Sequence, residues 1–185
     1  MDALNLLTTR NSAVKLAAPG PNDRELTALF AAASRAPDHG RLRPWRFLLI
    51  RDSSLSALGD LFAEAALRRE PTLAEPELAR FRQQPLRAPL IIVVVACLQD
   101  HPKIPLIEQQ LSAGCAAHGM LLAAEALGYA GIWRTGANAF DAHVMAGLGL
   151  SANEEISGFL YIGSREGRAK PLPEIAMADY VKDWR

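Results

Sequence analysis

The chain has 185 residues and carries 20 Lys+Arg against 20 Asp+Glu, so its formal net charge is zero. Half of the residues are hydrophobic, which is typical of one globular domain over residues 1–185 and excludes wholesale disorder. A neutral chain lacks the broad basic field that captures nucleic acid or an acidic membrane, so we expect neither partner. The charge balance leaves room for a local basic site that binds one phosphate.

The elements predicted from hydrophobic spacing and from Gly and Pro positions alternate between helix and strand. Asn22 with Glu25 three residues later is a capping pattern, and Gly128 is suited to end a long Ala- and Leu-rich helix. In chain order we predict a helix at 3–9, a helix from Asn22 to before Pro37, a strand at 45–50, a helix at 54–69, a short helix within 70–88, a strand at 90–97, a helix at 106–127, a short strand or turn at 131–135, a short helix at 140–147 and a strand at 156–163. This alternation alone favours a parallel α/β sheet.

Metal and acid–base chemistry find little support in the sequence. Cys97 and Cys115 have no zinc-binding spacing, and no further ligand is spaced to join Cys115 and His118, so we expect no metal and a buried, inert Cys115. The neighbouring carboxylates Glu154 and Glu155 are interpreted as a solvated cap. The start of the chain lacks a signal-peptide pattern, and the apolar run at 88–98 is too short for a membrane helix, so we expect a cytoplasmic protein.

Basic residues collect near the ends of the predicted elements: Arg10, Arg35, Arg41, Arg43, Arg134, Arg165, Arg168 and Lys170. Arg10, followed by Asn11 and Ser12, combines a guanidinium fork with a hydroxyl group, which suits a phosphate. The alternative is a solvated helix end, because most arginines are exposed. The polar strip 36–45 flanks a predicted strand, and loops in such places often carry functional sites.

Three segments stand out together: residues 1–12 with their Arg-x-Ser pattern, residues 35–47, and residues 128–136, supported by 112–114 and 158–163. In this order and spacing they resemble the flavin-dependent nitroreductase family, in particular its compact NAD(P)H nitroreductases. The resemblance covers nearly the whole chain and rests on the order and spacing of the segments. It implies an α+β fold, a three-layer α/β/α sandwich with a mainly antiparallel sheet, in place of the parallel sheet. It also implies a homodimer with FMN at the subunit interface and a C-terminal arm, residues 164–185, that docks on the partner subunit.

The resemblance also implies site residues and a reaction. The matching FMN contacts are Arg10, Asn11, Ser12, Arg35, His39, Gly131, Ile132, Trp133 and Lys170, with Arg168 as the alternative to Lys170. The nicotinamide dinucleotide is expected at Leu121, Leu122, Ala123, Ala124, Glu125 and Ala126. No side chain is expected to act as a catalytic nucleophile or base, because the flavin N5 atom carries the chemistry. NADH or NADPH would reduce the flavin, which would then reduce nitroaromatic, quinone or similar acceptors in a ping-pong cycle.

Several alternatives stay open at this point. Larger members of the family resemble Ser-x-x-Asn-x-Gln-Pro after the position of Pro37, whereas this chain has Asp38, His39 and Arg43, which leaves the acceptor open. The same fold could carry another reaction, such as reductive dehalogenation or flavin reduction, or a non-catalytic FMN-binding dimer. The remaining hypothesis is a soluble α/β domain that binds an unrelated ligand.

Overall fold

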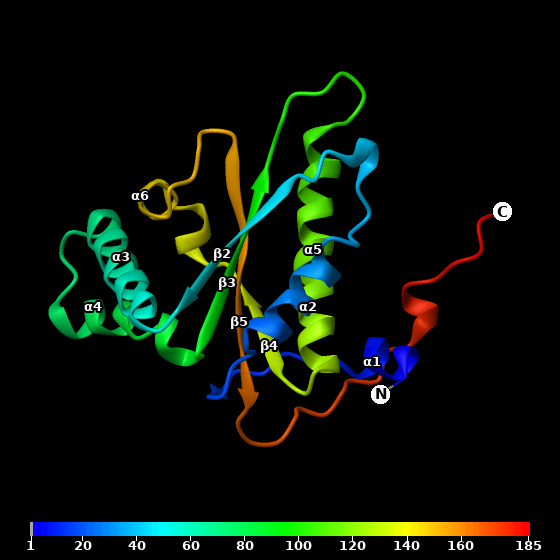
Figure 1. The fold of residues 1–185 in the computed structure, drawn as a ribbon, viewed down its shortest axis with the longest axis horizontal. Helices are drawn as coiled ribbons and strands as arrows, with labels where there is room; N and C mark the ends of the chain where they lie inside the picture. Colours follow the sequence, from blue (N-terminus) through cyan, green and yellow to red (C-terminus); the bar gives the residue numbers. More distant parts are fainter. Residues whose placement is uncertain (1) are drawn as a thin grey trace.

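A five-stranded antiparallel sheet forms the centre of the molecule, and helices cover both of its faces, so the chain is a three-layer α+β sandwich (Figure 1). The computed structural model describes residues 2–185. In chain order the elements are α1 (Ala3–Thr9), β1 (Leu16–Ala17), α2 (Asp23–Ala33), β2 (Trp45–Arg51), α3 (Ser53–Arg69), α4 (Glu75–Arg82), β3 (Leu90–Cys97), α5 (Leu106–Ala126), β4 (Ala130–Arg134), α6 (Ala142–Gly147) and β5 (Glu154–Arg165).

The parallel sheet favoured by the alternating pattern is wrong, and the antiparallel sheet implied by the family resemblance is confirmed. The strand order is β1–β5–β3–β2, and β4 also pairs with β5. The last residue of β2, Arg51, pairs with the first residue of β3, Leu90. Two successive helices, α3 and α4, connect these strands and bring the chain back to the end of the sheet at which β2 stops, so the two strands run in opposite directions.

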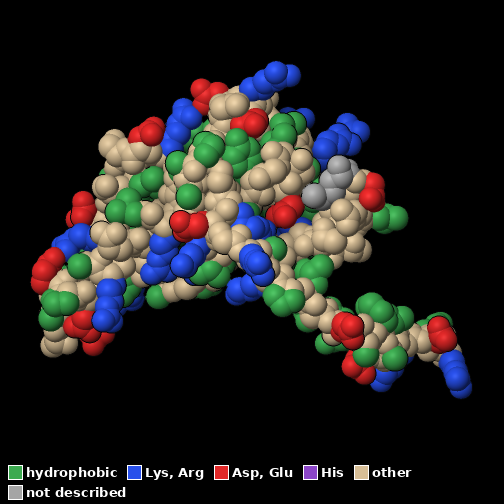
Figure 2. Space-filling view, turned by 90° about the horizontal axis from the view of Figure 1, so that it is seen from below, with side chains coloured by type: hydrophobic (Ala, Val, Ile, Leu, Met, Phe, Trp, Pro, Cys, Tyr) green, Lys and Arg blue, Asp and Glu red, His purple; other side chains and the backbone are tan. Residues whose placement is uncertain are grey.

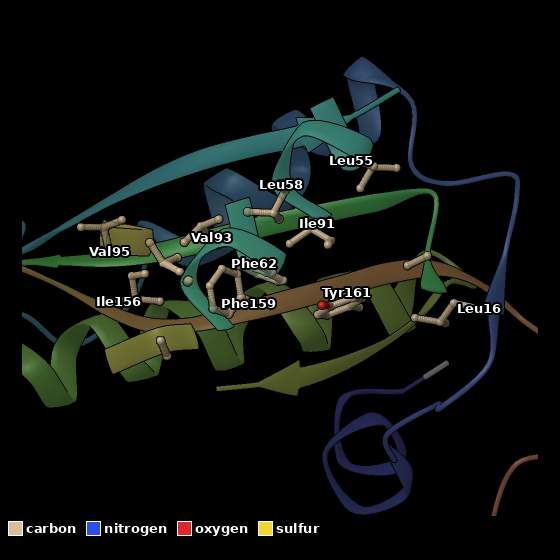
Figure 3. Close-up of a cluster of buried hydrophobic side chains, with 14 of the residues drawn as sticks. Leu16, Leu55, Leu58, Phe62, Ile91, Val93, Val95, Ile156, Phe159 and Tyr161 are labelled. Carbon is tan, nitrogen blue, oxygen red and sulfur yellow. The ribbon is translucent and has the colours of Figure 1, made fainter. Parts of the chain in front are cut away.

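The central strand β3 is buried on both sides, as its uninterrupted apolar sequence predicts. Its alternate residues supply two cores, one beneath α3 and α6 and one beneath α2 and α5. In the first core, Phe62 of α3 meets Phe159 of β5 edge to face, with ring centroids 5.3 Å apart (Figure 3). In the second, a Cβ at Gly119 of α5 would lie 3.2 Å from the carbonyl oxygen of Ala32, so glycine lets α2 approach closely.

Local signals account for most element boundaries. The side chain of Asn22 accepts a hydrogen bond from the Glu25 N–H, and the Glu25 carboxylate accepts one from the Asn22 N–H, which confirms the predicted capping box. Helix α5 ends before Gly128, whose φ of +89° lies in the left-handed region that glycine tolerates. Strand β1 was not predicted, because two residues carry no periodicity. Strand β5 extends two residues beyond the prediction at each end.

The last twenty residues, 166–185, are exposed along their whole length and lead away from the body of the molecule (Figures 1 and 2). They contain a single helical turn, Met177–Asp179, and carry uncovered apolar side chains: Leu172, Ile175, Met177, Tyr180, Val181 and Trp184. No helix within residues 2–185 combines the length and the apolar character needed to cross a membrane.

Candidate functional site

Two of the segments that resemble flavin-binding motifs meet at the free edge of β4. The Ala13 N–H donates to the Gly131 carbonyl oxygen over 3.2 Å, so the chain that follows Asn11 and Ser12 lies along this edge. In an antiparallel strand, alternate residues direct their backbone groups to the same edge, and those of Trp133 therefore face away from β5. Residues 118 positions apart in sequence thus form one candidate ligand-binding edge.

A basic concavity lies next to this edge. It has a volume of about 250 Å³, and its lining includes Ser12, Lys15, Arg165, Arg168 and Lys170. Figure 2 shows Lys and Arg side chains gathered where the C-terminal tail leaves the body. Four cationic side chains and a hydroxyl group around one small volume, with Glu166 as the only acidic residue in the lining, suit a phosphate group.

Asn11 joins the N-terminal segment to the chain that follows β5. Its Nδ2 donates to the Lys170 carbonyl oxygen over 3.3 Å, and its own carbonyl oxygen accepts from Arg165 over 3.2 Å. Its Oδ1 atom is buried and has no hydrogen-bond partner among residues 2–185. A buried acceptor without a partner is costly, so a donor from a bound ligand or water would stabilise this segment.

A second cavity, of about 400 Å³, opens on the side of β4 that faces α3. Its lining includes Ile132, Trp133, Arg134 and Gly136 from the end of β4 and the turn after it. The Trp133 indole lies across Gly158 of β5, and its Nε1 donates to the Ser157 carbonyl oxygen over 3.1 Å. The predicted segment 131–133 therefore lies beside a polar cavity on one side and the N-terminal segment on the other.

The predicted residues Arg35 and His39 lie apart from this edge. His39 pairs with Glu108 in the first turn of α5 at 2.7 Å, whereas Glu125 in its last turn lies 3.5 Å from Arg165, beside Asn11. The two glutamates are seventeen residues apart, which is about 25 Å along a helix. Arg35 lines an open groove of about 530 Å³ with Leu111, Cys115, His118 and other residues of α2 and α5.

The segment predicted to bind the nicotinamide dinucleotide is the last part of α5. Leu121 and Ala124 are buried in the core beneath this helix, so they offer no surface to a ligand. Leu122, Ala123 and Glu125 are half-buried and Ala126 is exposed. The six residues do not line one cavity, and dinucleotide binding there stays a prediction.

The prediction of a solvated cap at the start of β5 fits Glu155, which is exposed, but is wrong for Glu154. The Glu154 side chain is only 10% exposed and forms two hydrogen bonds with Arg46, of 2.6 and 2.7 Å, across the sheet. Bonding to Arg46 lowers the pKa of Glu154 to about 2, while burial and Glu154 raise the pKa of Cys97 to about 11. A thiol this hard to ionise is a poor nucleophile, so this cluster is structural.

The expectation of a buried Cys115 is also wrong, because Cys115 is exposed on the face of α5 that lines the open groove. The prediction failed because the small residues of α5 carry no periodicity that separates its two faces. Residues 2–185 contain no cluster of three or more His, Cys, Asp or Glu side chains placed to hold a metal ion.

Sequence reasoning missed several lining residues. Lys15 belongs to the basic concavity, and four residues of the second cavity were not singled out: Gln84, Arg87, Asn138 and Tyr161. They come from four separate segments and no local pattern joins them. The only usable signal was Arg134 directly after Trp133, noted as one basic residue at an element end.

Comparison with known proteins gives the class to which this fold and site belong. The sequence pattern of the Nitroreductase family matches residues 7–164, so the chain belongs to the nitroreductase family. It is 38% identical over 169 residues to the "Putative NAD(P)H nitroreductase YdjA" of Escherichia coli strain K12, covering 91% of each chain. It is 39% identical over 185 residues to a protein of the same description from Haemophilus influenzae, covering 100% of this chain and 98% of that one. A nitroreductase from Bacteroides fragilis solved with bound FMN has the same fold, with a TM-score of 0.74, 20% identity and full coverage of both chains.

Proposed function

We propose that this protein is an FMN-dependent oxidoreductase of the cytoplasm that uses NADH or NADPH to reduce nitroaromatic, quinone or similar electron-poor acceptors. The observation that carries the proposal is the meeting of the Asn11–Ser12 segment with Gly131–Trp133 at one strand edge, between a basic concavity and a polar cavity. These residues fit FMN, because a phosphate matches the concavity and a flat, hydrogen-bonding ring matches the strand edge. The names of the E. coli and H. influenzae relatives and the FMN in the B. fragilis structure support it.

The chain's own residues bind and orient in this proposal. Arg10, Ser12 and Lys170 hold the phosphate, together with Lys15, Arg165 and Arg168, and the free backbone groups of Trp133 face the ring. When bound, FMN supplies hydride transfer at N5, and the protein supplies positioning and positive charge. One flavin site must serve the reductant and the acceptor in turn, so we expect ping-pong kinetics.

We further propose that the functional unit is a homodimer with FMN at the interface. His39 lies about 25 Å along α5 from the end near Asn11, so it reaches a flavin at Asn11 only from a partner subunit. The apolar face of α5, with Ile107 and Leu111 exposed, and the apolar tail would be covered in such a dimer. In this arrangement the tail docks on the partner as the exchanged arm.

The visible absorption spectrum of the purified protein tests the cofactor. We expect a yellow protein, or a colourless one that takes up added FMN, and bleaching by NADH or NADPH without oxygen. A protein that does not take up FMN would refute the proposal. A yellow protein that neither nucleotide bleaches would instead be a non-catalytic FMN-binding dimer.

Two variants test the residue roles. Arg10→Ala should release FMN about tenfold to a hundredfold more readily, because it removes a charged donor to the phosphate, while Arg24→Ala on the exposed face of α2 should retain it. Unchanged FMN affinity in Arg10→Ala would exclude the phosphate role. Removal of residues 171–185 should weaken the dimer in sedimentation experiments, and an unperturbed dimer would refute the exchanged arm.

A further inference from the structure

A further basic groove lies along the loop between α2 and β2. It has a volume of about 540 Å³ and shares no lining residue with the basic concavity or with the cavity beside β4. Its lining includes three guanidinium groups, one carboxylate and one indole ring: Arg35, Arg41, Arg43, Asp38 and Trp45. We call it the arginine groove. Its volume is within the range of pockets that bind small organic ligands.

The three cations of the arginine groove have no ionic partner. None of them forms an ion pair with any of residues 2–185. The carboxylate of Asp38 is occupied within its own loop, because Oδ1 accepts from the Leu42 N–H over 3.1 Å and Oδ2 from the Arg43 N–H over 2.8 Å. Three cations against one anion leave the lining with an excess of positive charge, which favours an anionic ligand.

The backbone that carries these arginines is strained. Arg41 and Arg43 have φ angles of +57° and +48°, in the left-handed region where glycine or asparagine would be less costly. The loop is fixed at both ends, since Ser112 Oγ donates to the Pro37 carbonyl oxygen over 2.5 Å and the Trp45 N–H to the Arg43 carbonyl oxygen over 2.7 Å. Strained residues that the surrounding structure holds in place cluster at ligand sites. Arginine at both strained positions therefore indicates that the guanidinium groups serve a ligand.

The chemistry of the lining fits a phosphorylated nucleoside. Arginine forks bind phosphate through paired N–H donors, and several such cations match the dianion of a phosphate monoester. Half-buried Trp45 offers a flat ring on which a purine can stack. In the proposed dimer His39, on the same loop, reaches the flavin of the other subunit, so the arginine groove would lie near a flavin that a nucleotide must reduce.

We propose that the arginine groove binds the 2′-phosphorylated adenosine of NADPH, and that Arg41 and Arg43 thereby make the protein prefer NADPH to NADH. The 2′-phosphate is a monoester dianion and is the one group by which the two nucleotides differ. The inference rests on the proposed function and deepens it, because it selects the reductant that the proposed function leaves open.

Binding of a nucleotide fragment without the nicotinamide tests the groove without turnover. Adenosine 2′,5′-bisphosphate and adenosine 5′-monophosphate differ only in the 2′-phosphate, which is a dianion at about pH 8. In titration calorimetry the FMN-loaded protein should bind the bisphosphate about tenfold to a hundredfold more tightly, the equivalent of one charge-assisted hydrogen bond. Arg41→Gln and Arg43→Gln should each lose most of this difference, and Arg43→Lys, which keeps the charge, should lose less. Arg68→Gln on the exposed face of α3 is the matched control and should behave as the wild type.

Equal affinity of the FMN-loaded wild type for the two fragments would overturn the inference and leave the proposed function intact. An unchanged difference in both glutamine variants would overturn it as well. A wild-type chain that takes up no FMN would instead overturn the proposed function.

Flavin reduction without oxygen, followed by stopped-flow absorbance, separates the reductant from an anionic acceptor as the occupant. The second-order rate constant should be higher for NADPH than for NADH, and Arg41→Gln and Arg43→Gln should lower the value for NADPH alone. Turnover with 4-nitrobenzoate and with the neutral 4-nitrobenzyl alcohol should change by the same factor in these variants. A loss confined to 4-nitrobenzoate, with reduction by NADPH unchanged, would assign the groove to the acceptor and overturn the inference.

The strained backbone supplies a variant that separates binding from folding. Arg43→Gly removes the guanidinium group and suits the φ of +48°, so the urea midpoint should not fall while the bisphosphate binds more weakly. Full bisphosphate affinity in the folded Arg43→Gly protein would show that the guanidinium group serves no ligand, and would overturn the inference.

Discussion

Gly158 on β5 makes room for Trp133, and its replacement by alanine should disturb both stability and the candidate flavin site. A Cβ at position 158 would lie 2.0 Å from Trp133 Nε1 and 2.5 Å from Cδ1, so the indole must move. Overpacking of this kind costs about 1–3 kcal/mol, and loss of the bond from Nε1 to the Ser157 carbonyl oxygen adds about 1 kcal/mol. We expect Gly158→Ala to lower the free energy of unfolding by about 2–4 kcal/mol in urea denaturation followed by circular dichroism.

A double-mutant cycle with Trp133→Leu isolates this contact. With the indole removed, Gly158→Ala should cost little, so the coupling energy between the two positions should be close to the whole cost of about 2–4 kcal/mol. The single variant Gly158→Ala should also bind FMN more weakly than the wild type in a fluorescence titration, because the displaced Trp133 belongs to the candidate flavin edge. Equal costs of Gly158→Ala in the two backgrounds would refute the reasoning.

Three further predictions concern stability. Glu154→Gln should cost about 2 kcal/mol near neutral pH in urea unfolding, because it leaves Arg46 without its partner. The pKa of Glu154 is lowered from 4.5 to about 2 in the fold, so its ionised form stabilises the fold above pH 4.5, and this stabilisation is lost as the pH falls towards 2. In Glu154→Gln the free energy of unfolding should therefore fall less between pH 4.5 and 2 than in the wild type. An equal fall in the two proteins would contradict this prediction. Gln109→Leu should cost about 1–3 kcal/mol, since Gln109 Oε1 accepts from the Gln99 N–H and Nε2 donates to the Gln99 and Ile104 carbonyl oxygens; an unchanged urea midpoint would refute it. Gly128→Ala should lower the melting temperature by an amount equivalent to about 1 kcal/mol because of its φ of +89°, and a rise would show that the helix end relaxes at no cost.

The sequence predicted those elements that local chemistry determines. The strand at 90–97 is apolar throughout, and Asn22 and Gly128 mark helix boundaries, so these features match the structure. The strand directions could not be predicted from the alternation of helices and strands, because they depend on the end of the sheet to which α3 and α4 return the chain. That information lies in the packing of helices on the sheet and not in any single segment.

The candidate site also contains residues that a local motif predicts and residues that only the folded chain brings together. Arg10, Asn11 and Ser12 form one contiguous motif, and the resemblance to a family supplied Gly131 to Trp133. Gln84 and Arg87 follow α4, and only the folded chain brings them to the cavity that Arg134 also lines. Asn138 accepts a hydrogen bond from Arg69, 69 positions earlier in sequence, and donates one to Gln84.

The candidate flavin edge is also an outer edge of the sheet, since β4 pairs with β5 on one side only and Ala13 covers its other side at Gly131. Uncovered strand edges are templates on which other chains can add as strands, and proteins usually shield them. A ligand at Trp133 would act as that shield, so loss of the cofactor should expose a short aggregation-prone edge. The tendency of the protein to aggregate would then depend on whether the cofactor is bound at β4, a strand of five residues.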